Sequence, residues 1–302
     1  MGCDARLTMD DPYEVTMPAE LIAAAECEGR EEWLQTLPAT IQQLEARWSI
    51  AVEEPFQPGG QTAWVAPVHG GGADLVIKVL WRHTEAEHEA EGLRAWNGNG
   101  AVRLHAACEI SAHTSALLLE RCRPGTALRA LPEPEQDLVV ASLLRRLWIE
   151  APAGHGFRSL QSMCDLWADE FEQKSVVKGS GGLDLGLVRE AIMLFRALPA
   201  SAEREVLLCT DLHTGNVLAA EREPWLVIDA KPYVGDPTYD ALQHMLNCDA
   251  RLHADPNGLA RRIADLLDLE AERLVLWLFA RCVQESAEWP QLANVARMLA
   301  PA

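Results

Sequence analysis

The segment CTDLHTGNVL, residues 209–218, carries two side chains that can bind a hydroxyl group or a cation, Asp211 and Asn216. Both come directly after an apolar run and are mixed with Thr and Gly, a pattern typical of a loop that follows a strand. An aspartate in such a loop can orient or deprotonate a hydroxyl group, and an asparagine oxygen is a suitable ligand for Mg²⁺. The D-x-x-x-x-N spacing alone is a weak signal, because these residue types also form ordinary turns.

The residues that follow predict a β-hairpin with a third acceptor. In NVLAAEREPWLVIDA, residues 216–230, two short apolar runs flank a polar turn. Antiparallel pairing would bring Asn216 at one end close to Asp229 at the other. Together with Asp211 they would surround one point, as hydroxyl activation beside a hard cation requires. The structural alternatives are an Asx-turn for Asp211, a cap for Asn216 and a solvated strand end for Asp229.

The first third of the chain predicts a β-rich region. A helical pattern in 30–48 precedes 49–81, where strand-like segments alternate with Gly-rich turns at 58–60 and 70–72. This pattern is typical of three antiparallel strands. A helix that ends at Asn-Gly is expected in 83–100, and a further apolar strand is expected in 115–122.

The rest of the chain has mostly helical periodicity. The clearest helical patterns lie in 134–152, 160–177, 185–198 and 271–289. In this half of the chain we expect only one pair of strands, the hairpin of 216–230. The sequence therefore favours an α+β fold in which strands gather early and helices late.

The composition restricts the partners of the protein. The chain has 302 residues, of which 49% are hydrophobic, and 45 acidic residues against 26 Lys and Arg give a net charge of −19. This charge argues against nucleic acid or an anionic membrane as a partner and favours a cationic ligand. The alternative is that the acidity serves solubility alone. Eight scattered cysteines predict neither disulfides nor zinc. With no apolar segment long enough to cross a bilayer and no signal-peptide pattern, we expect a cytoplasmic monomer.

A family resemblance rests on the order of these motifs. Lys78 lies on a strand in LVIKVL, Glu89 on a helix in EHEAEGL, and a link follows LLLERC before the D-x-x-x-x-N loop, the hairpin and VIDAKPYVGDPTYD. This order resembles the aminoglycoside phosphotransferases of the protein-kinase-like fold. The segment 209–248 is more narrowly similar to the streptomycin 6-kinase branch, whose relatives include hydroxyurea phosphotransferases.

The resemblance implies two lobes and two cofactors. A small N-lobe with an antiparallel sheet would span 1–120, and a larger, mostly helical C-lobe would span 121–302. ATP and Mg²⁺ would be the cofactors, and catalysis would rest on positioning and charge stabilisation.

The resemblance also assigns residues to the nucleotide. Lys78 would contact the α- and β-phosphates and be held by Glu89. The alternatives are a surface lysine at Lys78 and a neighbouring glutamate in place of Glu89. Glu120 and Cys122 fall at the link between the lobes, where the backbone would meet adenine. Gly59 and Gly60 sit where a loop would cover the phosphates, but QPGGQT is not a G-x-G-x-x-G motif.

Within the loop and hairpin the resemblance gives each acceptor a role. Asp211 would orient the attacking hydroxyl, and Asn216 with Asp229 would bind Mg²⁺. We expect His213 to support the loop. The chain departs from the wider family in having Cys209-Thr210 before Asp211 and Ala230 after Asp229; neither change removes an oxygen ligand. Asp236 and Asp240 are expected to hold the loop and a helix start.

The implied reaction is phosphorylation of the 6-hydroxyl of streptomycin, which confers antibiotic resistance. Two guanidinium groups on its streptidine ring would need carboxylate partners. Besides Asp211, the candidates for substrate contacts are His244, Asn247, Gln284, Glu285 and Glu288. The alternatives are a kinase of another small hydroxyl compound, such as hydroxyurea or a macrolide, and a degenerate kinase-like binding protein.

Overall fold

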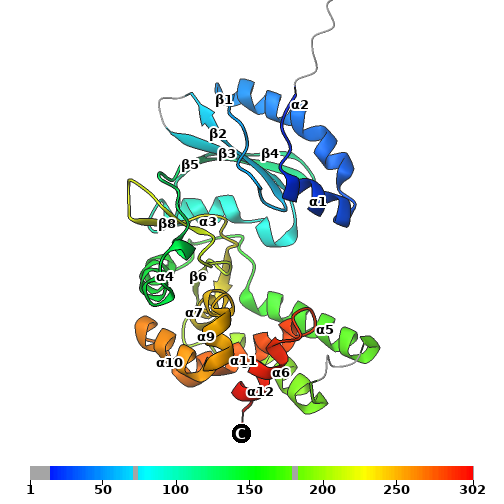
Figure 1. The fold of residues 1–302 in the computed structure, drawn as a ribbon, viewed down its shortest axis with the longest axis vertical. Coiled ribbons are helices and arrows are strands. Elements are labelled where there is room, and N and C mark those ends of the chain that lie inside the picture. Colours follow the sequence, from blue (N-terminus) through cyan, green and yellow to red (C-terminus); the bar gives the residue numbers. More distant parts are fainter. Residues whose placement is uncertain (1–13, 71–73, 179–182, 302) are drawn as a thin grey trace, which may run out of the picture. The chain divides into compact units, whose positions relative to one another are not determined.

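The computed structural model describes residues 14–70, 74–178 and 183–301. The chain forms two compact units, drawn as a ribbon in Figure 1. The first unit joins the described residues up to 83 with 104–121, and the second joins 84–103 with the described residues from 122 onward. The expected lobes, 1–120 and 121–302, differ from this grouping in the segment 84–103 and in Arg121.

The first unit is built on a five-stranded antiparallel sheet with the order β1-β2-β3-β5-β4. The three expected antiparallel strands are confirmed as β1, β2 and β3, and the expected strand at 115–122 is confirmed as β5. The sequence analysis missed β4, whose side chains are mostly exposed or half-buried. The strands are β1 Ala51–Val52, β2 Ala63–His69, β3 Leu75–Trp81, β4 Leu104–Ser111 and β5 Thr114–Glu120.

The core of this unit lies between the sheet and the helices α1 (Ala19–Glu28) and α2 (Glu31–Trp48). In α2, the apolar residues Trp33, Leu37, Ile41 and Leu44 recur at helical spacing and are buried against the sheet. Trp33 also donates its indole Nε1–H to Thr114 Oγ1 at 3.1 Å, so the helix is tied to β5 by a buried hydrogen bond.

The Gly-rich segment before β2 has a structural reason for its glycine. Gly59 adopts a positive φ of 88°, and a Cβ there would lie 2.3 Å from Pro18 Cβ. Glycine therefore allows the close approach of this loop to Pro18, with no ligand required. Of the second Gly-rich turn, Gly71 and Gly72 lie outside the described residues.

The second unit is mostly helical. The helices expected in 83–100, 134–152, 160–177, 185–198 and 271–289 are confirmed as α3, α4, α5, α6 and α11. A helix was also expected at and after GDPTYD, where the structure has the short helices α7 and α8; the described helices α9, α10 and α12 were not predicted. The helices are α3 Glu89–Trp96, α4 Glu133–Leu147, α5 Leu160–Lys178, α6 Leu185–Ala197, α7 Pro237–Asp240, α8 Leu242–Leu246, α9 Asp249–Ala254, α10 Pro256–Leu267, α11 Ala271–Glu285 and α12 Leu292–Leu299.

Helix α11 forms the centre of the helical part, where it packs against α6, α10 and α12 (Figure 1). Its Trp277 is fully buried and meets the rings of Phe195 and Tyr239 edge-on. The Trp277 indole N–H is satisfied by Asp236 Oδ2 at 2.8 Å. Asp236 also accepts the Thr238 N–H and so caps α7, as expected for the GDPTYD segment. No described helix has the length and apolar composition that a membrane span requires.

Two short antiparallel sheets complete the second unit. The expected hairpin is confirmed: β7 (Val217–Ala219) pairs with β8 (Trp225–Val227). The expectation of a single strand pair in this half was wrong, because β6 (Val206–Leu208) also pairs with β9 (Tyr233–Gly235). Strands of three residues are too short to show a period of two in the sequence.

Helix α3 makes a close contact with the segment that connects β8 to β9. A Cβ at Gly92 would lie 2.3 Å from Pro232 Cγ and 3.1 Å from the ring of Trp96. Trp96 is itself fixed, since its Nε1–H donates to the Leu147 carbonyl oxygen at 2.8 Å. The glycine therefore sets how closely α3 approaches the residues around Pro232.

We predict that Gly92→Ala lowers the free energy of unfolding by about 1–3 kcal/mol, because the clash outweighs the helix propensity that alanine adds. Chemical denaturation measures this difference. Arg94→Ala, on the exposed face of the same helix, serves as the control and should change stability by less than about 0.5 kcal/mol. A stabilised Gly92→Ala protein would mean that α3 does not approach Pro232 this closely.

Candidate functional site

The loop between β6 and β7 is a tight turn that presents Asp211. The Asp211 N–H donates to the Cys209 carbonyl oxygen at 2.8 Å, the His213 N–H to Asp211 O at 3.1 Å, and the Asn216 N–H to His213 O at 2.9 Å. These local bonds leave the Asp211 side chain half-buried. Asn216 Nδ2 adds a bond to Asp211 O at 3.1 Å, so the two predicted site residues are fixed to each other.

The hairpin brings Asn216 and Asp229 together as expected. The Ile228 N–H donates to the Asn216 carbonyl oxygen at 2.9 Å, directly before Asp229. The charges of Asp211 and Asp229 both act to raise the pKa of His213, against the larger effect of burial. Because Asn216 Nδ2 faces Asp211, its amide oxygen is turned the other way. The donor set is composed of hard oxygens, which suits Mg²⁺.

Two residues of the site have left-handed backbone conformations that side chains rarely adopt. Thr210 has a φ of 52° and Asp229 has a φ of 55°. For a β-branched residue such as Thr210 this conformation is strained, and it persists only where surrounding contacts hold it. The Thr210 hydroxyl supplies one of these contacts by donating to the Lys231 carbonyl oxygen.

The carboxylate of Asp240 supplies the other contacts that hold the backbone at Thr210. It accepts the Cys209 N–H at 3.0 Å, the Thr210 N–H at 2.6 Å and the Trp148 Nε1–H at 3.0 Å. Asp240 is only 1% exposed, and burial raises its pKa to about 6, with the three hydrogen bonds opposing that rise. Asp240 thus fixes the two residues that precede Asp211, as expected for this aspartate.

Lys231 forms an ion pair with Asp211. Its Nζ lies 3.2 Å from Asp211 Oδ2, and the two side chains are 28% and 16% exposed. The Lys231 N–H donates to the Cys209 carbonyl oxygen at 3.0 Å, which ties the segment between the hairpin and β9 to the loop. Asn216 Nδ2 lies 3.5 Å from the same Oδ2 atom. Among the described residues, no donor lies on the Oδ1 atom of Asp211.

His213 supports the loop, as expected. Its Nδ1 accepts the Gly215 N–H at 3.1 Å, so the ring is neutral with its proton on Nε2. Burial lowers the pKa of His213, although the nearby charges of Asp211 and Asp229 oppose this. A neutral imidazole in this turn serves geometry and adds no positive charge to the site.

A cavity of about 290 Å³ opens beside Asp211 within the second unit. Of the residues predicted to contact substrate, Gln284, Glu285 and Glu288 line it together with Asp211. Lys231 lines it too. The remaining lining residues are Met163, Trp167, Glu170, Phe171, Thr210, Tyr233, Tyr239, Gln243, Arg281 and Ala287.

Arg281 organises the α11 wall of this cavity. Its guanidinium stacks over the ring of Trp167, 4.5 Å from the centroid. It donates to Gln284 Oε1 at 2.5 Å and pairs with Glu285 Oε1 at 2.7 Å. The predicted substrate residues Gln284 and Glu285 are therefore already held by a buried cation.

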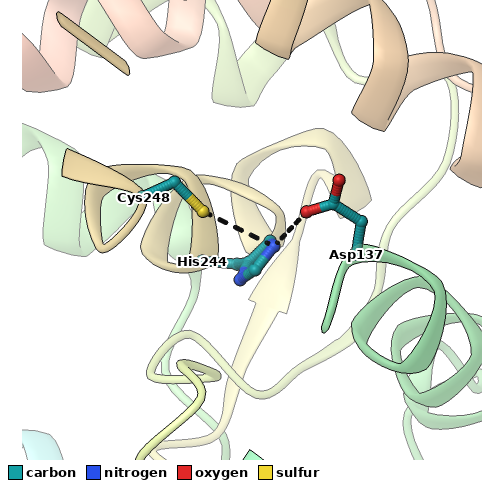
Figure 2. A group of neighbouring side chains, drawn as sticks. All are labelled: Asp137, His244 and Cys248. Atoms are coloured by element: carbon teal, nitrogen blue, oxygen red, sulfur yellow. Dashed lines mark hydrogen bonds and ion pairs between the residues drawn. The ribbon is translucent and has the colours of Figure 1, made fainter. Parts of the chain in front are cut away.

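His244 and Asn247, also predicted to contact substrate, do not line this cavity. His244 is buried on α8, where its Nε2 meets Asp137 Oδ1 at 2.8 Å (Figure 2). Asn247 is exposed and donates its Nδ2–H to the Gln243 carbonyl oxygen. The sequence places both one or two turns beyond GDPTYD, but the short helices α7 and α8 turn these side chains elsewhere.

Asp137, His244 and Cys248 form a cluster whose ligand-type atoms lie within 4.8 Å of one another (Figure 2). The Asp137 oxygens are also bound by two arginines: Arg251 reaches both, at 3.0 and 2.9 Å, and Arg262 Nε lies 2.6 Å from Oδ2. A metal ion here would face two guanidinium groups. Burial also raises the pKa of the Cys248 thiol to about 12. The cluster is therefore an ion-pair centre that joins α4 to α8, α9 and α10.

The residues predicted to bind the nucleotide are divided between the two units. Lys78 is buried in the middle of β3, opposite Val65 and Leu117. Glu89 is buried at the first residue of α3. Glu120 ends β5 in the first unit, and Cys122 begins the second part of the second unit. Their roles toward a nucleotide stay predictions.

Four lining residues whose side chains could contact a substrate were not predicted from the sequence: Lys231, Arg281, Trp167 and Glu170. Lys231 carried a usable signal, because it is a cation two residues beyond a predicted metal ligand. Arg281 lies three residues before Gln284 and four before Glu285, a spacing that places all three on one helix face. For Trp167 and Glu170 on α5, helical periodicity alone does not indicate which face meets a cavity.

We predict that Asp137→Ala lowers the free energy of unfolding by about 3 kcal/mol or more, because it leaves His244 and two arginines without their shared anion. The control is Glu135→Ala, an exposed residue of the same helix. The hydrogen bonds and charges around Asp137 hold its pKa well below the usual range, against the opposing effect of burial. Its stabilisation should be complete above about pH 4 and be lost as the pH falls further. Equal stability of the two variants would contradict this assignment.

We predict that ionisation of Asp240 destabilises the fold as pH rises. Its folded pKa of about 6 exceeds the usual aspartate value of about 4, so the unfolded chain releases this proton first. Relative to Asp240→Asn, the wild type should lose on the order of 3 kcal/mol between about pH 4 and pH 6. Denaturation across this range measures the difference, with the exposed Asp265→Asn as control. A difference that does not change with pH would contradict the raised pKa.

Comparisons with known proteins agree with this geometry. A family model for aminoglycoside/hydroxyurea antibiotic resistance kinases matches residues 47–292. The chain is 32% identical over 285 residues to a streptomycin 6-kinase of Streptomyces glaucescens, which covers 90% of each chain. It is 35% identical over 281 residues to a hydroxyurea phosphotransferase of Kitasatospora aureofaciens, covering 89% of this chain and 79% of the relative.

The fold is also similar to that of solved structures. A thermostable mutant of aminoglycoside phosphotransferase APH(4)-Ia, in a ternary complex with ADP and hygromycin B, matches with a TM-score of 0.60 and 16% identity, covering 86% of this chain and 99% of that chain. This likeness supports the protein-kinase-like architecture expected from the sequence. The family match over most of the chain, with the loop and hairpin described above, shows that the protein belongs to the aminoglycoside/hydroxyurea antibiotic resistance kinases.

Proposed function

We propose that the protein transfers the γ-phosphoryl group of ATP to a hydroxyl group of a cationic aminoglycoside, with the 6-hydroxyl of streptomycin as the first candidate. The observation that carries this proposal is the cavity beside Asp211, where an acceptor hydroxyl would meet the candidate base and a cationic body would meet carboxylates. The streptomycin 6-kinase among the relatives supports the choice of aminoglycoside.

The charge of the cavity supports a cationic substrate. Four carboxylates line it, and the two cations among its lining residues are already engaged: Arg281 with Glu285 and Lys231 with Asp211. Glu288 is exposed on the same wall. An excess of negative charge in a partly enclosed site favours guanidinium groups, which carboxylates can bind through paired hydrogen bonds.

Asp211 is proposed as the group that accepts the proton of the attacking hydroxyl. Its Oδ2 is held by Lys231, and its Oδ1 is the oxygen that can accept this proton. Asn216 and Asp229 would hold Mg²⁺, which would neutralise the charge of the nucleotide phosphates. The tight turn, Asp240 and the hairpin keep these three side chains fixed, so little reorganisation accompanies the reaction.

The nucleotide would be bound by residues predicted from the sequence. We propose that Lys78 contacts the α- and β-phosphates and that Glu89 supports it, with the backbone near Glu120 and Cys122 facing adenine. The proposed N-lobe of residues 1–120 would provide most of this site. Lys78 and Glu89 are both buried. Because a buried charge is rarely left without a partner, their burial supports a role in binding for both side chains.

Hydroxyurea is the second candidate acceptor. The hydroxyurea phosphotransferase among the relatives is 35% identical to this chain. Arg281 occupies Glu285 and so reduces the attraction of the α11 wall for a large cation, whereas a small neutral acceptor needs no such attraction. A macrolide is less suitable, because an apolar macrocycle would have to bury the carboxylates of this cavity.

The proposal is tested by incubating the protein with labelled ATP and Mg²⁺ and each of streptomycin, a second aminoglycoside, hydroxyurea and a macrolide. We expect transfer to streptomycin, with a KM that rises with salt because binding is partly electrostatic. Glu288→Gln should raise the KM for streptomycin and leave that for hydroxyurea unchanged. Transfer to hydroxyurea without transfer to streptomycin would make the second candidate the function.

We predict that Asp211→Asn lowers kcat by at least about a hundredfold while ADP–Mg²⁺ affinity changes little, because Asp211 acts on the acceptor hydroxyl. Asp229→Asn should instead weaken both Mg²⁺-dependent nucleotide binding and turnover, since it removes a charged metal ligand. Calorimetric titration with ADP–Mg²⁺ and steady-state assays separate the two effects. Near-normal turnover of a folded Asp211→Asn protein would exclude this role.

A further inference from the structure

We propose that Lys231 is a catalytic residue, whose ammonium group binds the phosphoryl group during its transfer as well as the Asp211 carboxylate. This inference rests on the proposed function and extends it, because neither the D-x-x-x-x-N loop nor the expected metal ligands include a cation at the reacting atoms. The starting observation is the 3.2 Å ion pair between Lys231 Nζ and Asp211 Oδ2.

The position of Lys231 follows from backbone contacts on both sides. Its N–H donates to the Cys209 carbonyl oxygen, and its carbonyl oxygen accepts the Thr210 hydroxyl. These contacts fix Lys231 to the residues directly before Asp211. It also follows Asp229 by only two residues, so its backbone begins at the proposed metal site and its side chain ends at the proposed base.

The chemistry of the transfer calls for a cation at this place. As the acceptor oxygen bonds to the γ-phosphorus and the bond to the β–γ bridging oxygen breaks, negative charge spreads over the oxygens of the moving group. The acceptor proton passes to Asp211, and ADP leaves with the bridging oxygen. A cation next to both the acceptor and the moving group stabilises this charge most where water is excluded.

Lys231 is suited to this task, and Arg281 is not. Within the described part of the chain these two are the cations that line the cavity. Arg281 is stacked on Trp167 and bonded to Gln284 and Glu285, which commits its charge to the α11 wall. Lys231 instead reaches the proposed base itself. An ammonium group has three N–H donors, so it can bind more than one oxygen at the same time.

A purely structural role for Lys231 would act only through Asp211, and a double-mutant cycle separates the two roles. We expect Lys231→Met to lower kcat by about a hundredfold with small changes in both KM values, and Lys231→Arg to retain part of the rate because the charge remains. In the Asp211→Asn background, Lys231→Met should still cost at least about tenfold. No further loss in that background would overturn the proposal and leave Lys231 as a positioning residue.

A second measurement does not depend on the acceptor. ADP–Mg²⁺ with aluminium fluoride imitates the transferred phosphoryl group, and the wild type should bind this combination at least about tenfold more tightly than ADP–Mg²⁺ alone. Lys231→Met should lose this gain while its affinity for ADP–Mg²⁺ and its unfolding midpoint stay unchanged. An unchanged gain would overturn the proposal.

The matched control is Arg129→Met, which removes an exposed cation whose charge acts on His213 but which does not line the cavity. It should change kcat and the fluoride-dependent gain by less than about threefold. An equal loss in this control would mean that general positive charge, and not Lys231, is required. If the wild type phosphorylates none of the tested acceptors but shows the Lys231-dependent gain, the proposed substrate fails while this inference stands.

Discussion

The site depends on one buried carboxylate. Asp240 accepts the N–H groups of Cys209 and Thr210 and the indole N–H of Trp148. It thereby holds Thr210 in a left-handed conformation that a β-branched residue adopts only under constraint. Without this turn the chain would leave β6 in another direction, and Asp211 would not meet Lys231 or Asn216. The pKa of Asp240 is raised because this carboxylate is buried away from water.

The sequence predicted the helices α2, α4, α5, α6 and α11, four of the five strands of the first sheet and the β7–β8 hairpin, since each has a clear period or turn signal. Strand β4 and the twelve-residue helix α10 were not predicted. The sequence also predicted that the hairpin brings the backbone of Asn216 close to that of Asp229, because a hairpin leaves little freedom to its ends. The β6–β9 pair was not predictable in the same way: three residues carry no period, and the pairing joins segments 25 residues or more apart. That pair is what brings Lys231 to Asp211.

The different positions of the residues predicted to contact substrate have a related cause. Asp211, Gln284, Glu285 and Glu288 reach one cavity, whereas His244 turns toward Asp137. A helix of fifteen residues such as α11 keeps a constant face, so its spacing predicts which side chains lie together. Helices of four and five residues, such as α7 and α8, change direction between them. The sequence gives no sign that His244 binds Asp137, or that Arg251 and Arg262 bind the same carboxylate.

The charge pairs of the cavity also bear on how one fold could serve both aminoglycoside and hydroxyurea phosphorylation. Arg281 fixes Glu285 in a defined position, but it competes with any cationic substrate for that carboxylate. A bound guanidinium therefore gains less from Glu285 than from Glu288, which lies one turn further along the chain. Binding of a neutral acceptor does not disturb the Arg281–Glu285 pair. Discrimination between the two substrate classes should thus reside in the acids that Arg281 leaves accessible, while the roles proposed for Asp211 and Lys231 would be the same for both.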